Sequence, residues 1–159
     1  MNTLDEVDLR RYKPEYLPWL KAFELPKEQE KFTALPTKML EITKERHPIV
    51  ILHNNEPVGF FVLHSSDRVK DYTNNPKAML LTALSINHSK QGRGFANKGM
   101  RKIQSFVDQQ FPECNEIILA VNHKNVPAQK LYEKVGFKDT GTRKIGRIGE
   151  QYIYTFSIK

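Results

Sequence analysis

Long apolar runs in the middle of the chain predict the strands of a buried sheet. Residues 49–53 and 58–64 are apolar and are separated by the turn sequence Asn-Asn-Glu-Pro, which predicts a β-hairpin. Residues 78–87 follow a polar loop at 65–76 and are almost continuously apolar, as in a strand buried on both faces. We therefore expect this strand to lie at the centre of the sheet.

Helical spacing replaces the strand pattern in the next part of the chain. Apolar residues recur at intervals of three or four over residues 96–107 and predict one amphipathic helix, which ends before Pro112. After a strand at 116–122, Asn125 is predicted to cap a second helix, whose apolar stripe ends at Gly136. Strand, helix and strand in this order indicate a right-handed parallel crossover within a mixed sheet.

The N-terminal part of the chain is less regular. Residues 7–12 alternate as in a short first strand, and several prolines then break the chain into short helical pieces. No element is predicted for the polar residues 27–35, whereas Thr37 is expected to cap a short helix that reaches Ile42.

The C-terminal end of the chain completes the predicted sheet. Residues 138–145 and 150–158 are expected to form a hairpin, with Tyr152, Tyr154 and Phe156 alternating on one face. The full order is strand, short helices, three strands, helix, strand, helix and two strands.

Length and composition fit one soluble domain over residues 1–159. A chain of 159 residues with 39% hydrophobic and 27% charged residues can bury a core without disulfides or metals. No apolar run approaches the roughly 20 residues that a membrane helix needs, and the acidic N-terminus does not read as a secretory signal. The single cysteine, Cys114, excludes an intramolecular disulfide and a thiolate metal cage. We expect a cytoplasmic protein that has no membrane partner.

The sharpest local feature is the sequence Gln-Gly-Arg-Gly-Phe-Ala at residues 91–96, between the central strand and the amphipathic helix. Glycines let the backbone approach a ligand, and the unpaired N–H groups of a helix start favour an anion such as pyrophosphate. Arg93 and Lys98 add positive charge. A glycine-rich turn that only connects strand and helix is the alternative. Asn97 stands where the dinucleotide motif needs a third glycine, and no Gly-Lys-Ser/Thr occurs, so dehydrogenases and P-loop NTPases are disfavoured.

Residues 125–137, Asn-Val-Pro-Ala-Gln-Lys-Leu-Tyr-Glu-Lys-Val-Gly-Phe, would by themselves be a capped helix with an apolar stripe. Together, the two segments resemble the GNAT superfamily of acetyl-CoA-dependent N-acetyltransferases. The first is similar to that family's acetyl-CoA signature at Gln91, Gly94 and Ala96, and the second to its Asn-x-x-Ala-x-x-Leu-Tyr-x-x-x-Gly-Phe segment. The resemblance implies the α/β GNAT fold, a mixed central sheet of about seven strands flanked by about four helices.

The resemblance also implies how the chain holds acetyl-CoA, its co-substrate. Main-chain groups of residues 84–86 would pair with the pantetheine arm as an added strand, and the amides of residues 92–96 would hold the pyrophosphate. Asn125 would touch the pantetheine arm, and Tyr132 would stand beside the thioester sulfur as the general acid that protonates the departing thiolate. The expected cofactor-binding residues are Leu84, Ser85, Ile86, Gln91, Gly92, Arg93, Gly94, Phe95, Ala96, Asn125 and Tyr132.

A general base is not identified by sequence. Leu80 stands where some members of the superfamily have a glutamate, and His88 stands where the signature often has a proline. His88 and His123 follow strands whose C-terminal ends face the expected cleft, so either is a candidate to take a proton, although a surface-loop histidine is the simpler interpretation. The other three histidines follow no metal-ligand spacing, and no metal site is predicted.

The acceptor is the least defined part of the prediction. Residues 30–34 and 57–60 loosely resemble spermidine/spermine-type acetyltransferases, which favours a primary amine of a small, polyamine-like molecule. The acids available to hold such a cation are Glu24, Glu28, Glu30, Glu41 and Asp71. An aminoglycoside, an amino acid or a protein N-terminus stays open as the acceptor.

Functions outside this class have weaker support. The net charge of +7 suits a polyphosphate cofactor, but it also motivates a nucleic-acid-binding module. Basic residues are spread along the chain and the aromatic residues alternate with strand spacing, so we expect no nucleic-acid partner. A CoA-binding regulator without turnover is a third alternative, and the sequence leaves the oligomeric state, a homodimer included, open.

Overall fold

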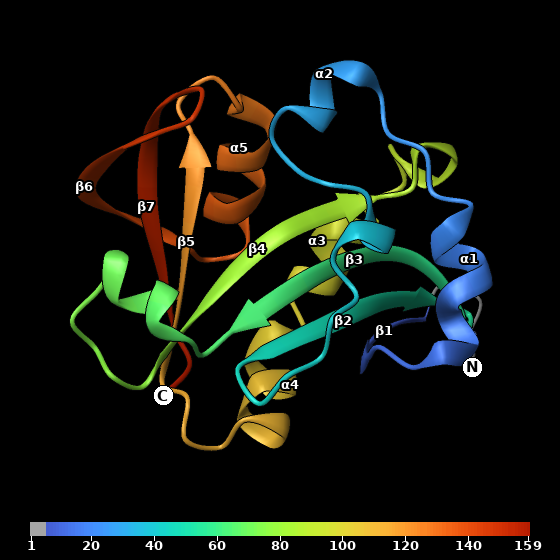
Figure 1. Ribbon diagram of the computed structural model, residues 1–159, viewed down its shortest axis with the longest axis horizontal. Helices are drawn as coiled ribbons and strands as arrows, with labels where there is room; N and C mark the ends of the chain where they lie inside the picture. Colours follow the sequence, from blue (N-terminus) through green and yellow to red (C-terminus); the bar gives the residue numbers. More distant parts are fainter. Residues whose placement is uncertain (1–5) are drawn as a thin grey trace.

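The structure is a computed structural model that describes residues 6–159. These residues form a seven-stranded sheet in the order β1-β2-β3-β4-β5-β7-β6, with β4 in the middle (Figure 1). Neighbouring strands are antiparallel except for β4 and β5, which are parallel. The strands are β1 (Val7–Arg11), β2 (Arg46–His53), β3 (Glu56–His64), β4 (Ala78–Ile86), β5 (Glu116–Asn122), β6 (Lys138–Gly146) and β7 (Gly149–Ser157).

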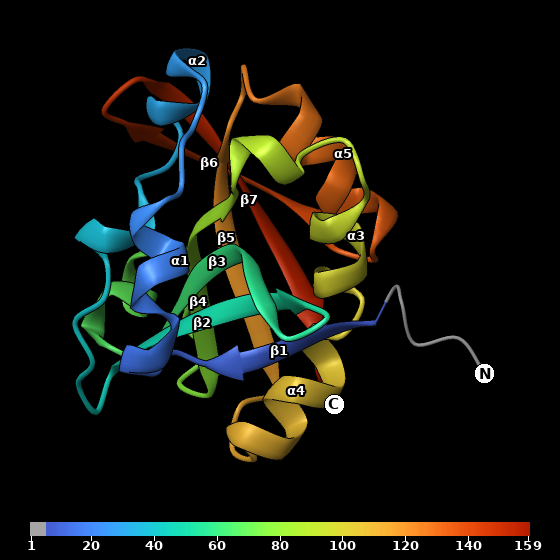
Figure 2. The ribbon, with the colours of Figure 1, turned by 90° about the vertical axis from the view of Figure 1, so that its right-hand side faces the viewer.

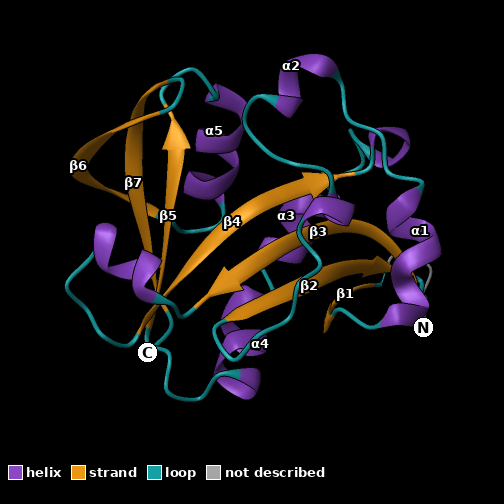
Figure 3. Ribbon diagram, in the orientation of Figure 1, coloured by secondary structure: helices purple, strands orange, loops and turns teal. Residues whose placement is uncertain are grey.

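Helices cover both faces of the sheet (Figure 2). Helices α1 and α2 lie on one face, and α3, α4 and α5 lie on the other. Short helical turns joined by loops make up the chain between β1 and β2 (Figure 3). The α-helices are α1 (Leu17–Lys21), α2 (Lys27–Glu30), α3 (Phe95–Met100), α4 (Ile103–Gln110) and α5 (Val126–Lys134), and the 3-10 turns are Pro14–Tyr16, Pro36–Lys38, Asp67–Asp71 and His88–Lys90.

The core follows from the alternation of side chains along the strands. Ile49, Ile51, Phe61 and Leu63 point to the face of α3, α4 and α5, whereas their neighbours Val50, Val62 and Phe60 point to α1. Both sets are fully buried, because the central strands have helices on either side. Among the helices of the described chain, none has the length and apolar character needed to cross a lipid bilayer.

The feature that creates the site is the separation of β4 from β5. The two strands pair at three positions, from Ala78 opposite Glu116 to Leu80 opposite Ile118. Beyond Leu80 the register between β3 and β4 shifts, and Ala83 adopts a left-handed φ of 59°, which marks a bulge. Meanwhile β5 pairs with β7 along its whole length. The bulge bends β4 away, so the two parallel strands diverge toward their C-terminal ends (Figure 1).

The sequence predicted the order of the strands along the chain correctly but was wrong about two helices. Residues 96–107 form two helices instead of one, because the ladder breaks after Met100, where the amide of Lys102 bonds to the carbonyl of Gly99. Gly99 is a weak helix former. It also lies so close to Ile51 that a Cβ would be 3.1 Å from that side chain, so glycine serves the packing of α3 against β2.

The helix expected between Thr37 and Ile42 is also absent from the described chain. Pro36 instead begins a 3-10 turn of three residues, with Leu35 rather than Thr37 as the preceding cap. Met39 ends the turn and packs with its neighbours against the core around Leu20. Burial of these apolar side chains outweighs the local capping signal. Conversely, the polar segment for which no element was predicted contains α2.

Candidate active site

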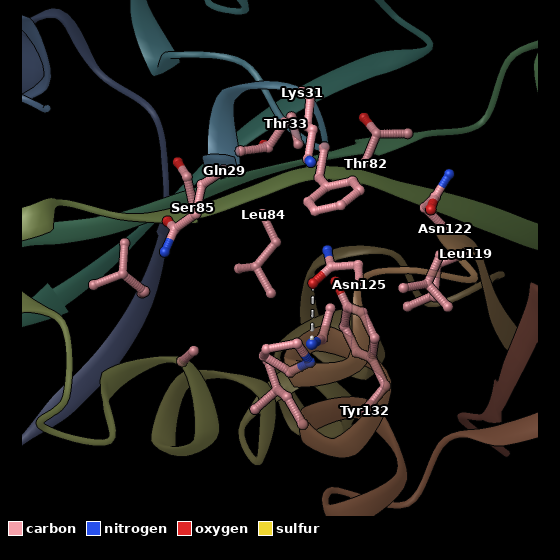
Figure 4. A pocket seen from close by; sticks show the side chains of 18 of the residues that line it. Gln29, Lys31, Thr33, Thr82, Leu84, Ser85, Leu119, Asn122, Asn125 and Tyr132 are labelled. Carbon is pink, nitrogen blue, oxygen red and sulfur yellow. Dashed lines mark hydrogen bonds between the residues drawn. The ribbon is translucent and has the colours of Figure 1, made fainter. Parts of the chain in front are cut away.

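A cavity of about 1140 Å³ opens where β4 and β5 diverge. Its walls come from the C-terminal halves of both strands, from α2, from the glycine loop at residues 91–97 and from the start of α5 (Figure 4). The turn between β6 and β7 closes one side through Arg147 and Ile148. Ligands of open α/β sheets bind at the C-terminal ends of parallel strands that separate, and this cavity has that position.

The glycine loop presents open backbone to the cavity. Gly92 and Gly94 have φ values of +78° and +81°, and a Cβ built on either would meet no atom within 4 Å. Gly94 is the N-cap of α3 and makes no side-chain capping bond. The first amides of α3 therefore carry the positive end of the helix without a side-chain cap. This arrangement fits a diphosphate, because there is space beside the backbone and a donor set facing it.

Two residues of the predicted loop use their side chains elsewhere. Phe95 has its side chain buried in the core, with its ring 4.5 Å from that of His53. Its backbone is therefore the part that is left to face the cavity. Arg93 is not among the cavity-lining residues, and its guanidinium lies over the Phe95 ring at 4.9 Å. The other nine predicted cofactor-binding residues line the cavity along with Phe95.

Gln91 fixes the start of the loop through its side-chain amide. Its Nε2 donates to the carbonyl of Ile86 and to Oε1 of Gln29, both at 2.9 Å, and Nε2 of Gln29 donates back to Oε1 of Gln91 at 3.2 Å. The pair joins α2 to the end of β4 across the cavity wall. The role of Gln29 could not be predicted from the sequence, because nothing in a short polar helix signals a hydrogen-bond partner 62 residues away.

On the β4 side, the main chain of residues 84–86 borders the cavity. Ser85 and Ile86 pair with Phe60 and Gly59 of β3 on their other side, and β5 has already diverged. An extended ligand arm could therefore add to this edge as a strand would. The Ser85 side chain is itself buried and lies on the face of α1 and α2.

On the opposite wall, α5 contributes Asn125 and Tyr132 (Figure 4). Oδ1 of Asn125 accepts a hydrogen bond from the amide of Ala128 and caps the helix. Tyr132 is 6% exposed and packs against Phe137 at 5.3 Å between ring centroids. Burial raises the pKa of the Tyr132 phenol, so it stays protonated at neutral pH and is able to act as a proton donor.

Asn122 organises the side of the cavity near the β6–β7 turn. It is buried at the end of β5, donates through Nδ2 to the carbonyl of Ile148, and accepts from the amide of Lys124. These bonds hold the turn that carries Arg147 against the end of β5. A sequence pattern cannot identify this role, because Asn122 is separated from Ile148 by 26 residues.

Several other candidates lie away from the cavity. His88 and His123, the two histidines considered as bases, are not among its lining residues. Cys114 is buried elsewhere in the core, and burial raises the pKa of its thiol, which keeps it a poor nucleophile. Of the five acids considered for a cationic acceptor, Glu28 and Glu30 on α2 line the cavity. Among residues 6–159 there is no group of three or more acidic, histidine or cysteine side chains arranged to hold a metal ion.

The fold and the cavity define an α/β protein with a ligand site where two parallel strands diverge, and comparison with known proteins identifies the family. The family model described as the acetyltransferase (GNAT) family matches residues 10–137, so the chain belongs to this family. The chain is 47% identical to the uncharacterized N-acetyltransferase YbbJ of Bacillus subtilis (strain 168) over 152 residues. The aligned region covers 93% of this chain and 95% of that protein. The chain is thus an N-acetyltransferase with acetyl-CoA as its co-substrate.

Solved structures that share the fold hold different ligands. An aminoglycoside acetyltransferase, AAC(6')-Ib in complex with coenzyme A and kanamycin, is similar with a TM-score of 0.74 and 18% identity, over 96% of this chain and 95% of that one. NAA60 of Arabidopsis thaliana in complex with a bisubstrate analogue has a TM-score of 0.64 and 15% identity, over 97% and 100% of the two chains. At these identities the similarity shows a shared fold and leaves the acceptor undetermined.

The pair of Gln29 and Gln91 yields a prediction for cofactor binding. We expect Gln29→Ala to weaken CoA binding roughly fivefold, the equivalent of about 1 kcal/mol, because Gln91 loses its two hydrogen bonds with Gln29 and keeps the one to Ile86. Titration calorimetry with CoA measures this change. The matched control is Gln104→Ala on α4, which removes a hydrogen bond from Nε2 of Gln104 to the carbonyl of Ile158 and should leave CoA affinity unchanged. Equal CoA affinity of Gln29→Ala and the wild type would show that α2 does not support the loop.

Proposed function

We propose that this enzyme acetylates a primary amine of a small molecule, with a polyamine-like amine favoured, by direct attack of the amine on acetyl-CoA. The observation that carries the proposal is the cavity itself, in which an open glycine loop, a free strand edge and Tyr132 lie around the gap between β4 and β5. Acetyl-CoA supplies an acyl group activated as a thioester. The chain's own residues hold it, orient the amine and move protons.

The residues present fit acetyl-CoA. The amides of residues 92–96 would take the diphosphate, residues 84–86 would pair with the pantetheine arm, and Asn125 would contact that arm from α5. Lys90 and Lys124 also line the cavity and supply positive charge for the phosphates. Backbone N–H groups of residues 84–86 would polarise the acyl carbonyl, and holding both reactants in one slot would supply much of the rate.

Tyr132 is proposed to protonate the thiolate that leaves. Its position on the cavity wall and its protonated phenol support this role. A buried phenol keeps its proton at neutral pH, so Tyr132 has a proton to donate to the sulfur as negative charge develops there.

Charge on α2 supports a cationic acceptor. The carboxylates of Glu28 and Glu30 line the cavity from α2, so a second ammonium group of the acceptor would meet negative charge there. The cationic side chains of Lys31 and Arg147 also line the cavity, and Arg147 comes from the separate β6–β7 turn. A linear diamine is able to extend along the α2 wall and away from Arg147.

An aminoglycoside is the second candidate. It also carries several ammonium groups that Glu28 and Glu30 could meet, and the fold is shared with an aminoglycoside acetyltransferase that binds kanamycin. A peptide N-terminus would instead need recognition of a main chain.

We also propose that residues 1–159 form a single domain and that the enzyme works in the cytoplasm. The family match covers residues 10–137, and the remaining C-terminal hairpin is part of the same sheet. A single buried cysteine suits a reducing compartment.

A thiol-release screen tests the proposed acceptor class. Purified enzyme is incubated with acetyl-CoA and with spermidine, kanamycin, free amino acids or a peptide that has a free N-terminus, and free CoA thiol is measured. We expect spermidine to give the largest enzyme-dependent release. If CoA thiol is released with the peptide and with none of the small molecules, the small-molecule proposal is wrong. If it is released with kanamycin but not with spermidine, the acceptor is an aminoglycoside rather than a polyamine.

A further inference from the structure

A buried histidine reaches the cavity through a threonine. His64 ends β3 and is 2% exposed, and its Nε2 lies 2.7 Å from Oγ1 of Thr82 on β4. Thr82 is half-buried and lines the cavity. His64 is therefore connected to a cavity-lining residue by a side-chain hydrogen bond, whereas the sequence offered His88 and His123 as candidate bases.

Thr82 occupies a defined place on the cavity wall. It lies two residues beyond Leu80, the last residue of β4 that pairs with β5, so it is at the narrow end of the gap. At about 3.3 Å per residue, the four-residue step from Thr82 to Ile86 spans roughly 13 Å. The glycine loop lies beyond Ile86. An extended arm anchored at the loop would bring its far, reactive end toward Thr82. Figure 4 shows that Thr82 and Leu84 both come from β4, with the Leu84 side chain pointing toward Asn125 and Tyr132 and the Thr82 side chain on the other side of the strand.

The reaction needs a proton acceptor at this end of the cavity. Leu80 cannot serve, and His88 and His123 do not line the cavity. Tyr132 holds its proton and faces from the opposite wall. Glu28 and Glu30 belong to α2, whose Gln29 is hydrogen-bonded to Gln91 of the glycine loop. The hydroxyl of Thr82, backed by an imidazole, is the group in place.

We propose that Thr82 and His64 form a proton relay that removes the proton from the acceptor amine during acetyl transfer. The inference depends on the acetyltransferase activity but not on which amine is the acceptor. Transfer forms one C–N bond at the acyl carbon and breaks the C–S bond, whose electron pair leaves with sulfur. The amine nitrogen loses its proton to Oγ1 of Thr82, whose own proton passes to Nε2 of His64. Tyr132 protonates the sulfur from the other wall, and exchange with solvent afterwards resets both groups.

The surroundings keep His64 neutral in the resting enzyme. Burial, followed by the charges of Arg68, Arg46 and His47, lowers the pKa of His64 to about 4. The imidazole is thus free to accept a proton throughout the neutral range. Such a base is too weak to deprotonate a free ammonium ion. The nitrogen becomes far more acidic than a free ammonium ion once it has bonded to the acyl carbon, and at that point a weak base is able to take its proton. The same positive neighbours favour rapid return of the proton to solvent.

The relay requires one tautomer of His64. If the proton is on Nδ1, Nε2 accepts from the Thr82 hydroxyl, and the hydroxyl oxygen keeps lone pairs for the amine. If the proton is on Nε2, His64 donates to Thr82 and is unable to take its proton. The two arrangements are distinguished by the ¹⁵N chemical shifts of the imidazole, with His64 assigned by its loss in His64→Gln.

Kinetics on the most active amine of the screen test the relay by mutation. Thr82→Val keeps the branched shape and removes the hydroxyl, and His64→Gln keeps a hydrogen-bonding group but no base. We expect each to lower kcat by about 10²-fold without a change in the KM for acetyl-CoA, and the double variant to lose no more than either single one. Thr82→Ser should retain most of the activity. His88→Asn, an exposed histidine outside the cavity, should behave as the wild type.

Several results would overturn the relay. A kcat of Thr82→Val within twofold of the wild type would contradict the relay. A decrease in kcat of the double variant equal to the product of the two single decreases would also contradict it. If His64→Gln does not fold, the contrast between Thr82→Val and Thr82→Ser decides. If no tested amine is acetylated, the proposed acceptor class fails, and the tautomer still decides the relay: a proton on Nε2 excludes it, and a proton on Nδ1 supports it.

Discussion

Gly94→Val is expected to abolish the stabilisation that CoA gives to the folded enzyme. A ligand that binds only the folded state at 100 times its Kd stabilises it by about 2.7 kcal/mol, which raises the melting temperature by several degrees. The space next to Gly94 is empty and opens to the proposed diphosphate site, so a valine side chain would occupy it. We expect the CoA-dependent shift in melting temperature, measured by differential scanning fluorimetry, to disappear.

The substitution also strains the backbone, and this effect needs its own control. Gly94 has a φ of +81°, where a residue other than glycine costs about 1–2 kcal/mol. Gly141 on β6 has a φ of +86° and equally open space around its Cα, but it is not a cavity-lining residue. Gly141→Val should lower the melting temperature to a similar extent and keep the full shift with CoA. An undiminished shift in Gly94→Val would mean that the diphosphate does not bind at this loop.

Tyr132→Phe is expected to lower kcat by about 10²-fold while leaving the fold and CoA binding intact. The substitution keeps the ring that packs against Phe137 and removes the hydroxyl that is proposed to protonate the thiolate. A CoA thiolate leaves more readily than most groups, so a smaller decrease would indicate that departure of sulfur limits the rate only in part. The measurement is kcat, the KM for acetyl-CoA and the melting temperature on one amine.

Tyr154→Phe is the matched control for Tyr132→Phe. Tyr154 is also a buried tyrosine beside α5, but its hydroxyl donates to Oε2 of Glu133 at 2.5 Å, and it does not line the cavity. Its loss should lower stability by about 1 kcal/mol and leave kcat unchanged. If Tyr132→Phe turns over normally, or loses activity only in step with stability as Tyr154→Phe would, then Tyr132 is a core residue rather than the acid.

The strands and their order could be read from the sequence because the signal is local. An apolar run such as residues 78–87 specifies a strand buried on two faces, and the glycine loop and Asn125 mark where helices begin beside it. The helix break after Met100 could not be read from the sequence, and neither could the close approach of Gly99 to Ile51. Apolar spacing is continuous across that break and gives no sign of it.

The parts of the site that the sequence missed are all pairs distant in the chain. Gln29 meets Gln91, Asn122 holds Ile148, and His64 meets Thr82 only because β3 and β4 are neighbours in the sheet. His64 follows no metal-ligand spacing and so carries no signal in the sequence, whereas His88 and His123 are candidates because they follow strands whose ends face the cleft. Their actual positions depend on the loops that follow β4 and β5, where sequence patterns carry little information.

Transfer of a labelled acetyl group to an amine is the most direct measurement of the central claim. The enzyme is incubated with acetyl-CoA labelled in the acetyl group and with each amine of the screen, and products are identified by mass spectrometry. The account predicts label bound covalently to the amine nitrogen, in an amount equal to the free CoA that is formed. Release of CoA with the label recovered only as acetate, or binding of CoA without transfer to any amine, would contradict it.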